Sequence, residues 1–292
     1  MAYAIDTLTG YSFTDVYHVF MEAFFDYVQD ASHVTEYSFR NRAIKNGVDL
    51  DQSVGAFSNG GLAGFTLVGL DQFEGSQCAF DAGTGIIKAQ RGKGIAKEMF
   101  DFLAPKLARM GVERFILEVL KENAPAIRAY QKADFQITRE LDSFELIFEN
   151  ARLDETSDEK IEFYNISKDE LLSYQAYFDW QPSWENSLSS IQRIPNEVLQ
   201  IGIRYEGMNA GILVYYPMLN WIMCLAVKKA FRRRRIASHL LGYLKNSIGE
   251  DVEKVRLINV QHTDQGMIQC LDKVGFQYVF DQYEMDLALT PR

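Results

Sequence analysis

Cysteine and histidine are scarce in this chain of 292 residues, which holds three cysteines and four histidines. Cys78, Cys224 and Cys270 are too few and too scattered to form a disulfide framework or a zinc site. The histidines show no spacing typical of metal ligands. The sequence therefore argues against a small disulfide-stabilised fold, and we predict that the chain binds no metal.

Long hydrophobic runs are also missing. The apolar run Trp221–Val227 has seven residues, whereas a helix that spans a membrane needs about 20. The N-terminal sequence MAYAID contains no basic stretch followed by an apolar one, so we expect no secretory signal. With 47% apolar and 24% charged residues, the composition is that of a globular protein. We expect a soluble cytoplasmic protein with no membrane partner.

Acidic residues outnumber basic ones, so the net charge is −10 at pH 7. Residues 1–150 carry 14 Lys and Arg against 21 Asp and Glu, and residues 151–292 carry 16 against 19. An acidic surface argues against general nucleic-acid binding. In the first half it favours a cationic substrate, since opposite charges raise encounter rates. An acidic surface kept for solubility explains the same charge equally well.

Two segments of the sequence repeat each other at one constant offset. Basic residues and an apolar-periodic segment follow Ile86, and the same pattern follows Val227, 141 positions later. The endings QKADF at Phe135 and DKVGF at Phe276 are also 141 positions apart. A polar linker at residues 149–160 separates the copies. We therefore predict two copies of one folding unit, with domains at 1–150 and 151–292.

Hydrophobic periodicity in the first copy predicts an α/β fold. Helices are expected at residues 12–29, 36–46, 92–110 and 125–132. Strands are expected at residues 53–57, 62–70, 77–87, 115–120, 135–138 and 144–148. The small-residue stretch 81–85 either opens a substrate cleft or marks a bulge. This order of elements predicts an α+β mixed sheet with helices on both faces.

A loop with two glycines joins a strand to a helix at Arg91-Gly92-Lys93-Gly94-Ile95-Ala96. Glycine lets the backbone approach a ligand closely, and the first N–H groups of a helix have no partner within the helix. Such a helix start suits a phosphate, because its N–H groups and its dipole favour an anion. The loop alone is a weak signal, since many turns contain glycines at this spacing.

Residues downstream of the loop make the signal specific. They follow in a fixed order as Glu118, Val119, Asn123, Ala126, Tyr130 and Phe135. Together with the loop they resemble the GNAT superfamily of acyl-CoA-dependent N-acyltransferases, over most of residues 3–148. Asp134 stands where that family usually has glycine, which affects a turn rather than the chemistry. Both copies together resemble a tandem GNAT protein. This implies two GNAT-like domains, each a mixed, mostly antiparallel sheet flanked by helices, with one splayed strand pair.

The resemblance implies which residues bind acetyl-CoA. The backbone of Ile86, Ile87 and Lys88 would pair with its pantetheine arm. The loop from Arg91 through Gly92, Lys93, Gly94 and Ile95 to Ala96 would hold its pyrophosphate. Asn123 would bind near the pantetheine or the sulfur.

The resemblance also implies two catalytic residues. Tyr130 would protonate the leaving thiolate, although a tyrosine on an amphipathic helix also fits plain packing. Glu118 would act as the general base that the amine acceptor requires, although a solvent-facing role beside Lys121 or Arg128 also fits. Asp81 and Glu145 are rival carboxylates for the base.

The second copy departs from the motif. At the offset of 141 positions, Arg91 and Ala96 are retained, and the changed positions are occupied by Arg233, Arg235, Asn259, Asp264 and Leu271. The two arginines stand at the glycine positions, which puts long side chains where the backbone is to meet the pyrophosphate. Leu271 stands at the position of Tyr130 and cannot donate a proton. We predict a GNAT-like domain without catalysis, and acetyl-CoA bound only in the first domain.

The basic run at residues 228–235 has six charges in eight residues. Three interpretations remain open: a solvated loop, an anion site that holds a CoA phosphate by side chains, or a nucleic-acid contact. The acidic surroundings make nucleic acid the least favoured of the three.

The leading prediction is an acetyl-CoA-dependent N-acetyltransferase that acts on a small-molecule or peptide amine, with its chemistry in residues 1–150. One alternative is an acyl-CoA sensor without turnover, against which the intact Glu118 and Tyr130 argue. A second alternative is an interaction protein. The sequence names neither the acceptor amine nor the oligomeric state.

Overall fold

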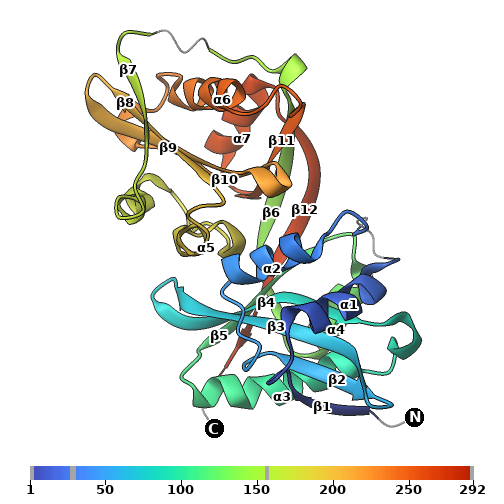
Figure 1. The fold of residues 1–292 in the computed structure, drawn as a ribbon. Coiled ribbons are helices and arrows are strands. Elements are labelled where there is room, and N and C mark those ends of the chain that lie inside the picture. The colour runs from blue at the N-terminus through green and yellow to red at the C-terminus, as the bar shows by residue number, and fades with distance from the viewer. Residues whose placement is uncertain (1–2, 27–30, 155–157, 290–292) are drawn as a thin grey trace. The chain divides into compact units, whose positions relative to one another are not determined.

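The computed structural model describes residues 3–26, 31–154 and 158–289, and the chain forms two compact units (Figure 1). Unit 1 consists of residues 1–139 and 283–292, and unit 2 consists of residues 140–282. Each unit is a mixed sheet with helices on both faces. The predicted α/β class is confirmed.

The strands of unit 1 lie in the order β1-β2-β3-β4-β5-β12. Their bounds are Tyr3–Thr7 (β1), Val54–Ser58 (β2), Gly61–Phe73 (β3), Ser76–Ile86 (β4), Arg114–Leu120 (β5) and the last part of Gln277–Ala288 (β12). The helices are Phe13–Phe24 (α1), Glu36–Lys45 (α2), Ile95–Arg109 (α3) and Ala124–Lys132 (α4). Strands β1 to β4 pair antiparallel, whereas β4 and β5 are parallel. The sheet is therefore mixed and mostly antiparallel, as expected.

Local sequence signals set the ends of these elements. Ser12 caps α1: its hydroxyl accepts from the N–H of Asp15, whose carboxylate accepts from the N–H of Ser12. Asn59 and Gly60, with φ of 53° and 80°, form the tight turn between β2 and β3. Helix α1 ends at Phe24, earlier than predicted, and residues 27–30 lie outside the described residues.

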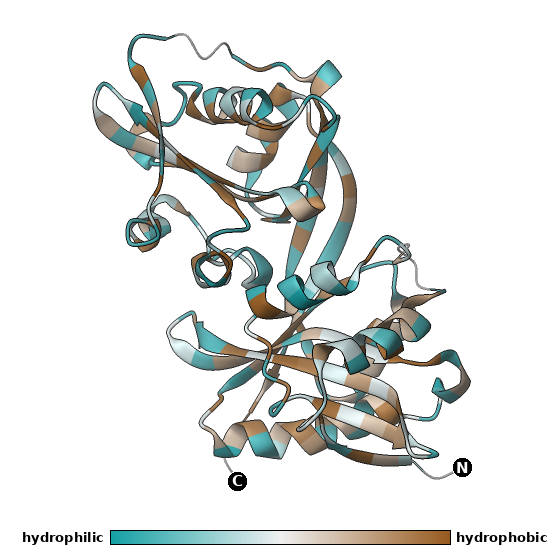
Figure 2. Ribbon diagram, viewed as in Figure 1, coloured by the Kyte–Doolittle hydropathy of each residue, from teal (hydrophilic) through white to brown (hydrophobic). Residues whose placement is uncertain are grey.

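Two hydrophobic clusters cover opposite faces of the sheet in unit 1. The cluster beneath α3 and α4 includes Phe100 and Phe115, and the cluster beneath α1 and α2 includes Phe39 and Phe65. Along α3, hydrophobic and hydrophilic bands alternate in Figure 2, as expected for a helix with one buried side. The sheet of unit 1 thus has a helix-covered core on each side.

Unit 2 has the same plan. Its strands lie in the order β6-β11-β10-β9-β8-β7, and β10 and β11 are the parallel pair. Their bounds are Gln136–Ile147 (β6, in unit 2 from residue 140), Ile161–Asn165 (β7), Leu199–Tyr205 (β8), Met208–Tyr216 (β9), Trp221–Val227 (β10) and Lys254–Gln261 (β11). The helices are Leu188–Arg193 (α5), Ile236–Ser247 (α6) and Gln265–Val274 (α7).

The sequence repeat is a structural repeat. Corresponding elements start or end 141 positions apart: β4 and β10 end at Ile86 and Val227, α3 and α6 begin at Ile95 and Ile236, and α4 and α7 begin at Ala124 and Gln265. The predicted tandem arrangement is confirmed, with α6 and α7 as the counterparts of α3 and α4.

The last part of the chain completes unit 1. Met285 and Leu289 lie in the core beneath α3, and the N–H of Leu289 donates to the carbonyl of Glu113 at 2.8 Å. Residues 140–150, in turn, belong to unit 2. The compact units therefore include other residues than the predicted domains 1–150 and 151–292. The division of the sequence repeat at residue 150 stays a prediction.

One element prediction is wrong. The strands expected at 135–138 and 144–148 are a single strand, β6. The charged residues between them do not interrupt it, because they are paired. Nε and Nη2 of Arg139 donate to the two carboxylate oxygens of Glu284, each at 2.7 Å. The carboxylate of Asp142 lies 2.9 Å from the ring nitrogen Nδ1 of His262.

Candidate functional site

The strand pair β4–β5 opens partway along its length. The two strands pair only from Cys78 to Asp81 of β4, and residues 83–86 pair with β3 alone. Among the described residues, the edge of β4 that faces β5 therefore has no strand partner beyond Asp81. A shift of register in the pairing with β3 shows that the stretch 81–85 marks a bulge, one of the two alternatives expected for it.

The loop after β4 has the geometry that its glycines predict. Gly92 and Gly94 have φ of 76° and 83°, in the left-handed region. Gly94 is the N-cap of α3, and no side chain caps this helix. The first N–H groups of any helix have no partner within the helix, so those of α3 have neither kind of partner. A Cβ at either glycine would meet no atom within 4 Å. Glycine is thus favoured here by backbone conformation rather than by lack of space.

Arg91 ties this loop to the end of α1. Its Nε donates to the carbonyl of Ile86 at 3.1 Å, and its Nη2 donates to the carbonyl of Ala23 at 2.6 Å and to Asp26 at 2.7 Å. Lys88 lies 3.3 Å from the same carboxylate. Hydrogen bonds from Arg91 and Lys88 lower the pKa of Asp26 to about 2. The guanidinium braces the loop, which leaves the Arg91 backbone rather than its side chain to face a ligand.

The residues expected to pair with pantetheine lie at the end of β4. Ile86 is the last residue of the strand, and Ile87 and Lys88 lead into a short 3-10 turn, Lys88–Gln90. The N–H of Ile87 donates to the carbonyl of Ala63 at 3.0 Å. The open edge of β4 therefore lies mainly before Ile86.

The remaining loop residues hold α3 in place. Lys93 donates to the side chain of Gln90 at 2.7 Å. Ile95 is buried in the core beneath α3, and Ala96 packs against that core. The side chains of Ile95 and Ala96 face the protein, so only the backbone N–H groups of these two residues are suited to a ligand.

Helix α4 carries two of the expected site residues. Asn123 is its N-cap and is 9% exposed, and its side-chain oxygen accepts from the N–H of Ala126 at 3.2 Å. The Tyr130 ring packs edge-on against Phe100 and Phe135, with centroid distances of 5.7 and 5.9 Å. Packing thus fixes the direction of the half-buried Tyr130 side chain.

Glu118 and Tyr130 belong to opposite faces of the sheet. Glu118 follows Leu117, the last residue of β5 that pairs with β4. Phe115, Leu117 and Val119 pack in the core beneath α3, together with Tyr130. Because side chains alternate along a strand, Glu118 points to the face covered by α1 and α2. The two predicted catalytic residues thus stand on either side of the opening between β4 and β5.

Asp81, one rival for the base, is buried on the α3 face. It pairs in parallel register with Leu117 and is 6% exposed. Its carboxylate accepts from the N–H of Gly83 at 2.9 Å and from the hydroxyl of Thr84 at 2.7 Å. Burial raises the pKa of Asp81 to about 6, and these two hydrogen bonds oppose that rise. The carboxylate shapes the bulge in β4.

Glu145, the other rival, lies on β6 in unit 2. It pairs with Arg256 at 2.8 Å and with Lys254 at 3.2 Å, both on β11. Burial acts to raise the pKa of Glu145, but the hydrogen bonds and charges of these two cations lower it overall. Its two ion pairs within unit 2 make Glu145 the weaker candidate for the base of the first repeat.

Unit 2 repeats the opening and the loop. Strands β10 and β11 pair only at Trp221 and Ile222 of β10, and then diverge. Arg233 and Arg235 have φ of 66° and 63°, the left-handed conformation of the glycines in unit 1. Both arginine side chains are exposed. The loop therefore keeps its shape without glycine.

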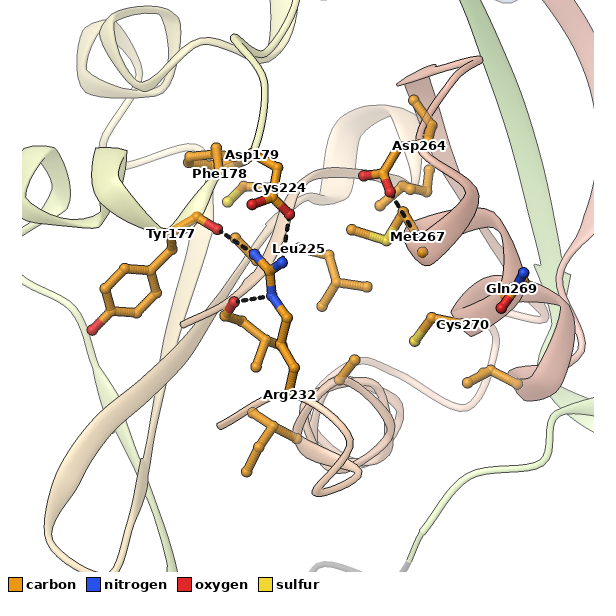
Figure 3. Close-up of a pocket in the computed structure, with 18 of the residues that line it drawn as sticks. Tyr177, Phe178, Asp179, Cys224, Leu225, Arg232, Asp264, Met267, Gln269 and Cys270 are labelled. Atoms are coloured by element: carbon orange, nitrogen blue, oxygen red, sulfur yellow. Dashed lines mark hydrogen bonds and ion pairs between the residues drawn. The ribbon is translucent and has the colours of Figure 1, made fainter. Parts of the chain in front are cut away.

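The arginine brace is repeated as well. Arg232 donates through Nε to the carbonyl of Val227 at 3.0 Å, and its terminal nitrogens donate to Asp179 at 2.5 Å and to the carbonyl of Tyr177 at 3.2 Å (Figure 3). Arg91 and Arg232 thus each join a carbonyl of the preceding strand to a carboxylate and a carbonyl from an earlier segment. Sequence reasoning missed this role, although the retention of arginine at both positions was a signal.

A cavity of about 540 Å³ lies in unit 2, lined by β10, β11, α6 and α7 and by residues 177–182. Figure 3 shows Leu225, Met267 and Cys270 around the hollow, with the ring of Tyr177 turned away from them. Trp180 closes part of it, and its indole N–H donates to Asp264 at 2.8 Å. The sequence did not predict this cavity, because the residues that line it come from segments far apart in the chain.

Two kinds of feature are absent from the described residues. Within residues 3–26, 31–154 and 158–289, no helix is long and apolar enough to cross a membrane. In the same ranges, no three His, Cys, Asp or Glu side chains are grouped as metal ligands would be.

Solved structures share this fold over the whole chain. A tandem GNAT protein from the clavulanic acid biosynthesis pathway is 12% identical, with a TM-score of 0.72 over 100% of this chain and 99% of that one. A GCN5-related N-acetyltransferase from Sphaerobacter thermophilus is 14% identical, with a TM-score of 0.72 over 99% and 96%. The glucosamine N-acetyltransferase region of a fungal multi-domain β-N-acetylglucosaminidase is 13% identical, with a TM-score of 0.73 over 98% and 38%. These likenesses are of fold.

The sequence itself matches a known family twice. None of the curated proteins matches the chain significantly. The model of the acetyltransferase (GNAT) family matches residues 13–135 and again residues 160–276, one segment for each repeat. Together these two segments cover more than half of the chain. The chain therefore belongs to the acetyltransferase (GNAT) family, as a tandem of two GNAT repeats.

Proposed function

We propose that the chain is an acetyl-CoA-dependent N-acetyltransferase whose chemistry takes place in unit 1. One observation carries the proposal. The strands β4 and β5 diverge where a loop with left-handed Gly92 and Gly94 starts α3, and α3 packs against the helix that bears Tyr130. An open strand edge beside a helix N-terminus suits a ligand with an amide-bearing arm and a phosphate.

Acetyl-CoA supplies an acetyl group activated as a thioester, and the residues of unit 1 fit it. The open edge of β4, which ends at Ile86 and leads into Ile87 and Lys88, suits the pantetheine arm. The N–H groups from Gly92 to Ala96 suit the pyrophosphate, since the first turn of α3 has no side-chain cap. We assign Asn123, at the start of α4, to the sulfur end of the arm.

Tyr130 is the proposed general acid. The leaving thiolate is the conjugate base of a thiol with a pKa of about 8–9, so only a modest acid is needed to protonate it. A phenol in a partly dry site can supply that proton. Packing against Phe100 and Phe135 orients the ring and so positions its hydroxyl. The corresponding residue of unit 2 is Leu271, which is fully buried and has no proton to give. This difference favours unit 1 as the catalytic one.

Glu118 is the proposed general base. An amine is mostly protonated near neutral pH and must lose a proton before it attacks. Glu118 faces the α1 and α2 side, whereas Tyr130 lies on the α3 side. This separation suits a reaction in which the amine arrives on one face and the thiolate leaves on the other. Asp81 lies on the α3 side and is engaged by Gly83 and Thr84, which makes it the weaker candidate.

The proposed acceptor is a small or peptide amine with positive charge. Residues 1–150 carry 21 Asp and Glu against 14 Lys and Arg, and such a surface attracts a cation. The fungal relative's name gives glucosamine as its acceptor, so amino sugars belong among the amines to test. We place the enzyme in the cytoplasm, on the ground that its three cysteines are free thiols.

The proposal is tested by thiol release from acetyl-CoA in the presence of polyamines, aminoglycosides, amino sugars, amino acids and peptides. We expect at least one cationic amine to raise thiol release well above hydrolysis, while its N-acetylated form, the matched control, does not. Because charge attraction is screened over about 10 Å at 0.1 M salt, kcat/KM for that amine is expected to fall as salt rises. Thiol release at the hydrolysis rate with every amine would contradict the proposal. A neutral or anionic acceptor would remove only the charge argument.

A further inference from the structure

Unit 1 has a small pocket that is lined by residues of α1, α2, β3 and β4, beside the opening between β4 and β5. We propose that this pocket binds a short, uncharged apolar group of the acceptor amine and so determines which amine is acetylated. Its volume of about 40 Å³ has room for about three to four carbon atoms, since one atom of the size of water needs about 10–15 Å³. The proposal rests on the proposed function and deepens it, because it names a class of acceptor.

The register of the strands places the pocket beside the proposed base. Ala82 and Gly83 line it, and they directly follow Asp81, the last residue of β4 that pairs with β5. Since Asp81 pairs with Leu117, the next residue along β5 is Glu118. Ala82 packs against the cluster beneath α1 and α2, on the face to which Glu118 points. The pocket therefore lies on the side from which the amine is proposed to arrive.

Aromatic rings form the walls of the pocket. Phe20 of α1 and Phe39 of α2 both line it, with ring centroids 5.0 Å apart, and Phe20 stacks on Phe24 at 4.6 Å. Phe65 of β3 also lines it and is fully buried. A Cβ at Gly85 would lie 2.9 Å from the rings of Phe24 and Phe65, so glycine lets both rings pack against β4. A hydrocarbon group that enters such a preformed apolar pocket leaves water at a gain in free energy.

The charge at the pocket argues against a second cation on the acceptor. Aromatic rings can attract an ammonium group, but Arg42 is the only charged residue among the described ones that line the pocket. A guanidinium is always protonated and repels another cation. A second ammonium would also lose water among side chains that cannot accept a hydrogen bond from it. The expected acceptor is therefore a monoamine with an apolar group rather than a diamine.

Primary amines of increasing length test the proposal by their binding, without turnover. Saturation-transfer NMR gives the Kd of each n-alkylamine in the presence of S-ethyl-CoA, a thioether that cannot donate an acetyl group. From ethylamine to pentylamine, the Kd is expected to fall about three- to fourfold for each methylene, the gain from burying one such group. From pentylamine to heptylamine it is expected to change less than twofold, because the pocket is then filled.

Two matched pairs of amines define the class of acceptor. Pentylamine and 1,4-diaminobutane have the same number of non-hydrogen atoms, and the diamine is expected to have a Kd at least tenfold higher. Isopentylamine and leucinamide carry the same apolar group, the first on a free amine and the second on an amine like that of a peptide N-terminus. Both are expected to bind more tightly than ethylamine, and the lower Kd of the two identifies the source of the acceptor.

Variants that change the size of the pocket are expected to change the preferred length. Phe20→Ala removes one wall, so heptylamine is expected to bind this variant at least fivefold more tightly than pentylamine does. A gain of affinity for longer amines cannot result from loss of folding. Val34→Phe fills the pocket and is expected to abolish the gain beyond ethylamine. Phe13→Ala is the matched control, because Phe13 of α1 packs against the same cluster without lining the pocket. It is expected to keep the wild-type series, and urea unfolding checks that each variant is folded.

Three results would overturn the proposal: a Kd independent of chain length in the wild type, a diamine that binds as tightly as pentylamine, or a length dependence that Val34→Phe leaves unchanged. The last result would place the apolar group elsewhere on the protein. Failure of the proposed function differs from all three. In that case thiol release stays at the rate of hydrolysis with every amine, whatever the NMR series shows.

Discussion

Arg233 and Arg235 take left-handed backbone angles that cost a non-glycine residue about 1–2 kcal/mol each. Gly92 and Gly94 reach the same angles at no such cost. A strained conformation persists where its surroundings require it, and here it starts α6, with Arg235 as the N-cap. The loop of unit 2 therefore keeps its shape at a cost in conformational free energy that the glycines of unit 1 avoid.

Asp81 is expected to make stability depend on pH. Its pKa is raised to about 6 by burial, above the ordinary value of 3.8. Between these values the folded state holds a proton that the unfolded state has lost, so the free energy of unfolding falls as pH rises from about 4 to about 6. We expect the free energy of unfolding of Asp81→Asn, measured with urea, not to fall over this pH range. Between pH 4 and pH 7 the variant is therefore expected to gain about 2–3 kcal/mol of stability relative to the wild type.

Asp51→Asn, at an exposed position of the same unit, is the control and is expected to keep the wild-type slope. An Asp81→Asn protein whose stability follows the wild-type pH curve would show that Asp81 ionises normally in the folded state.

At the scale of elements, the two arginine braces make a matched pair. Arg91 joins its loop to Ala23 and Asp26, and Arg232 joins the corresponding loop to Tyr177 and Asp179. Lysine keeps the charge, but its three N–H donors all lie on one nitrogen, whereas the guanidinium spreads its donors over three nitrogens and so reaches acceptors that lie apart.

Arg91→Lys is therefore expected to loosen the loop of unit 1 and to raise the KM for acetyl-CoA about three- to tenfold. Arg232→Lys is expected to leave acetyl transfer within twofold of the wild type, since its loop lies in unit 2. Steady-state kinetics on the acceptor found in the screen would compare them. Equal effects of both substitutions would contradict the assignment of catalysis to unit 1.

Most elements could be predicted because their signals are local. The Ser12 cap and the Asn59-Gly60 turn lie within a few residues of the ends that they define. Strand β6 was divided wrongly because its charged residues are paired with Glu284 and His262, more than 100 positions away in the sequence. Periodicity within a window cannot show a partner at that distance.

At the scale of the molecule, unit 1 combines two segments that are far apart in the sequence, whereas unit 2 is one continuous stretch. Arg139 and Arg114 of unit 1 pair with Glu284 and Asp286, and Met285 fills the core beneath α3. A fragment that ends at residue 150 lacks all of these partners. Loss of the partner of a buried cation costs about 3–5 kcal/mol, against a total stability of about 5–15 kcal/mol.

We therefore expect the fragment 1–150 to show no cooperative urea unfolding, despite its match to the predicted first domain. Adding a peptide of residues 277–292 is expected to restore a cooperative transition, and a peptide with Glu284→Ala and Met285→Ala serves as the control. A fragment 1–150 that unfolds cooperatively by itself would show that the last strand is dispensable.

The candidate site was predictable where a motif is contiguous and unpredictable where the fold assembles it. The loop around Gly92 and the helix with Tyr130 follow from spacing in the sequence. The cavity of unit 2 does not, because its lining combines Trp180 and Asn186 with residues of β10, β11, α6 and α7 that are distant in the sequence. The opposite faces of Glu118 and Asp81 likewise became evident only from the register of β4 and β5.

The most direct measurement is acetyl transfer by Tyr130→Phe, with thiol release as the readout. The substitution removes one hydroxyl and keeps the ring that packs against Phe100 and Phe135. We expect kcat to fall about 10²–10³-fold while the Kd for acetyl-CoA stays within threefold, because a general acid acts in the transition state. Tyr17→Phe, which removes a hydroxyl bonded to the Val34 carbonyl in the same unit, is expected to keep wild-type kcat. A Tyr130→Phe enzyme within twofold of the wild type would show that Tyr130 serves packing alone and that unit 1 uses another acid.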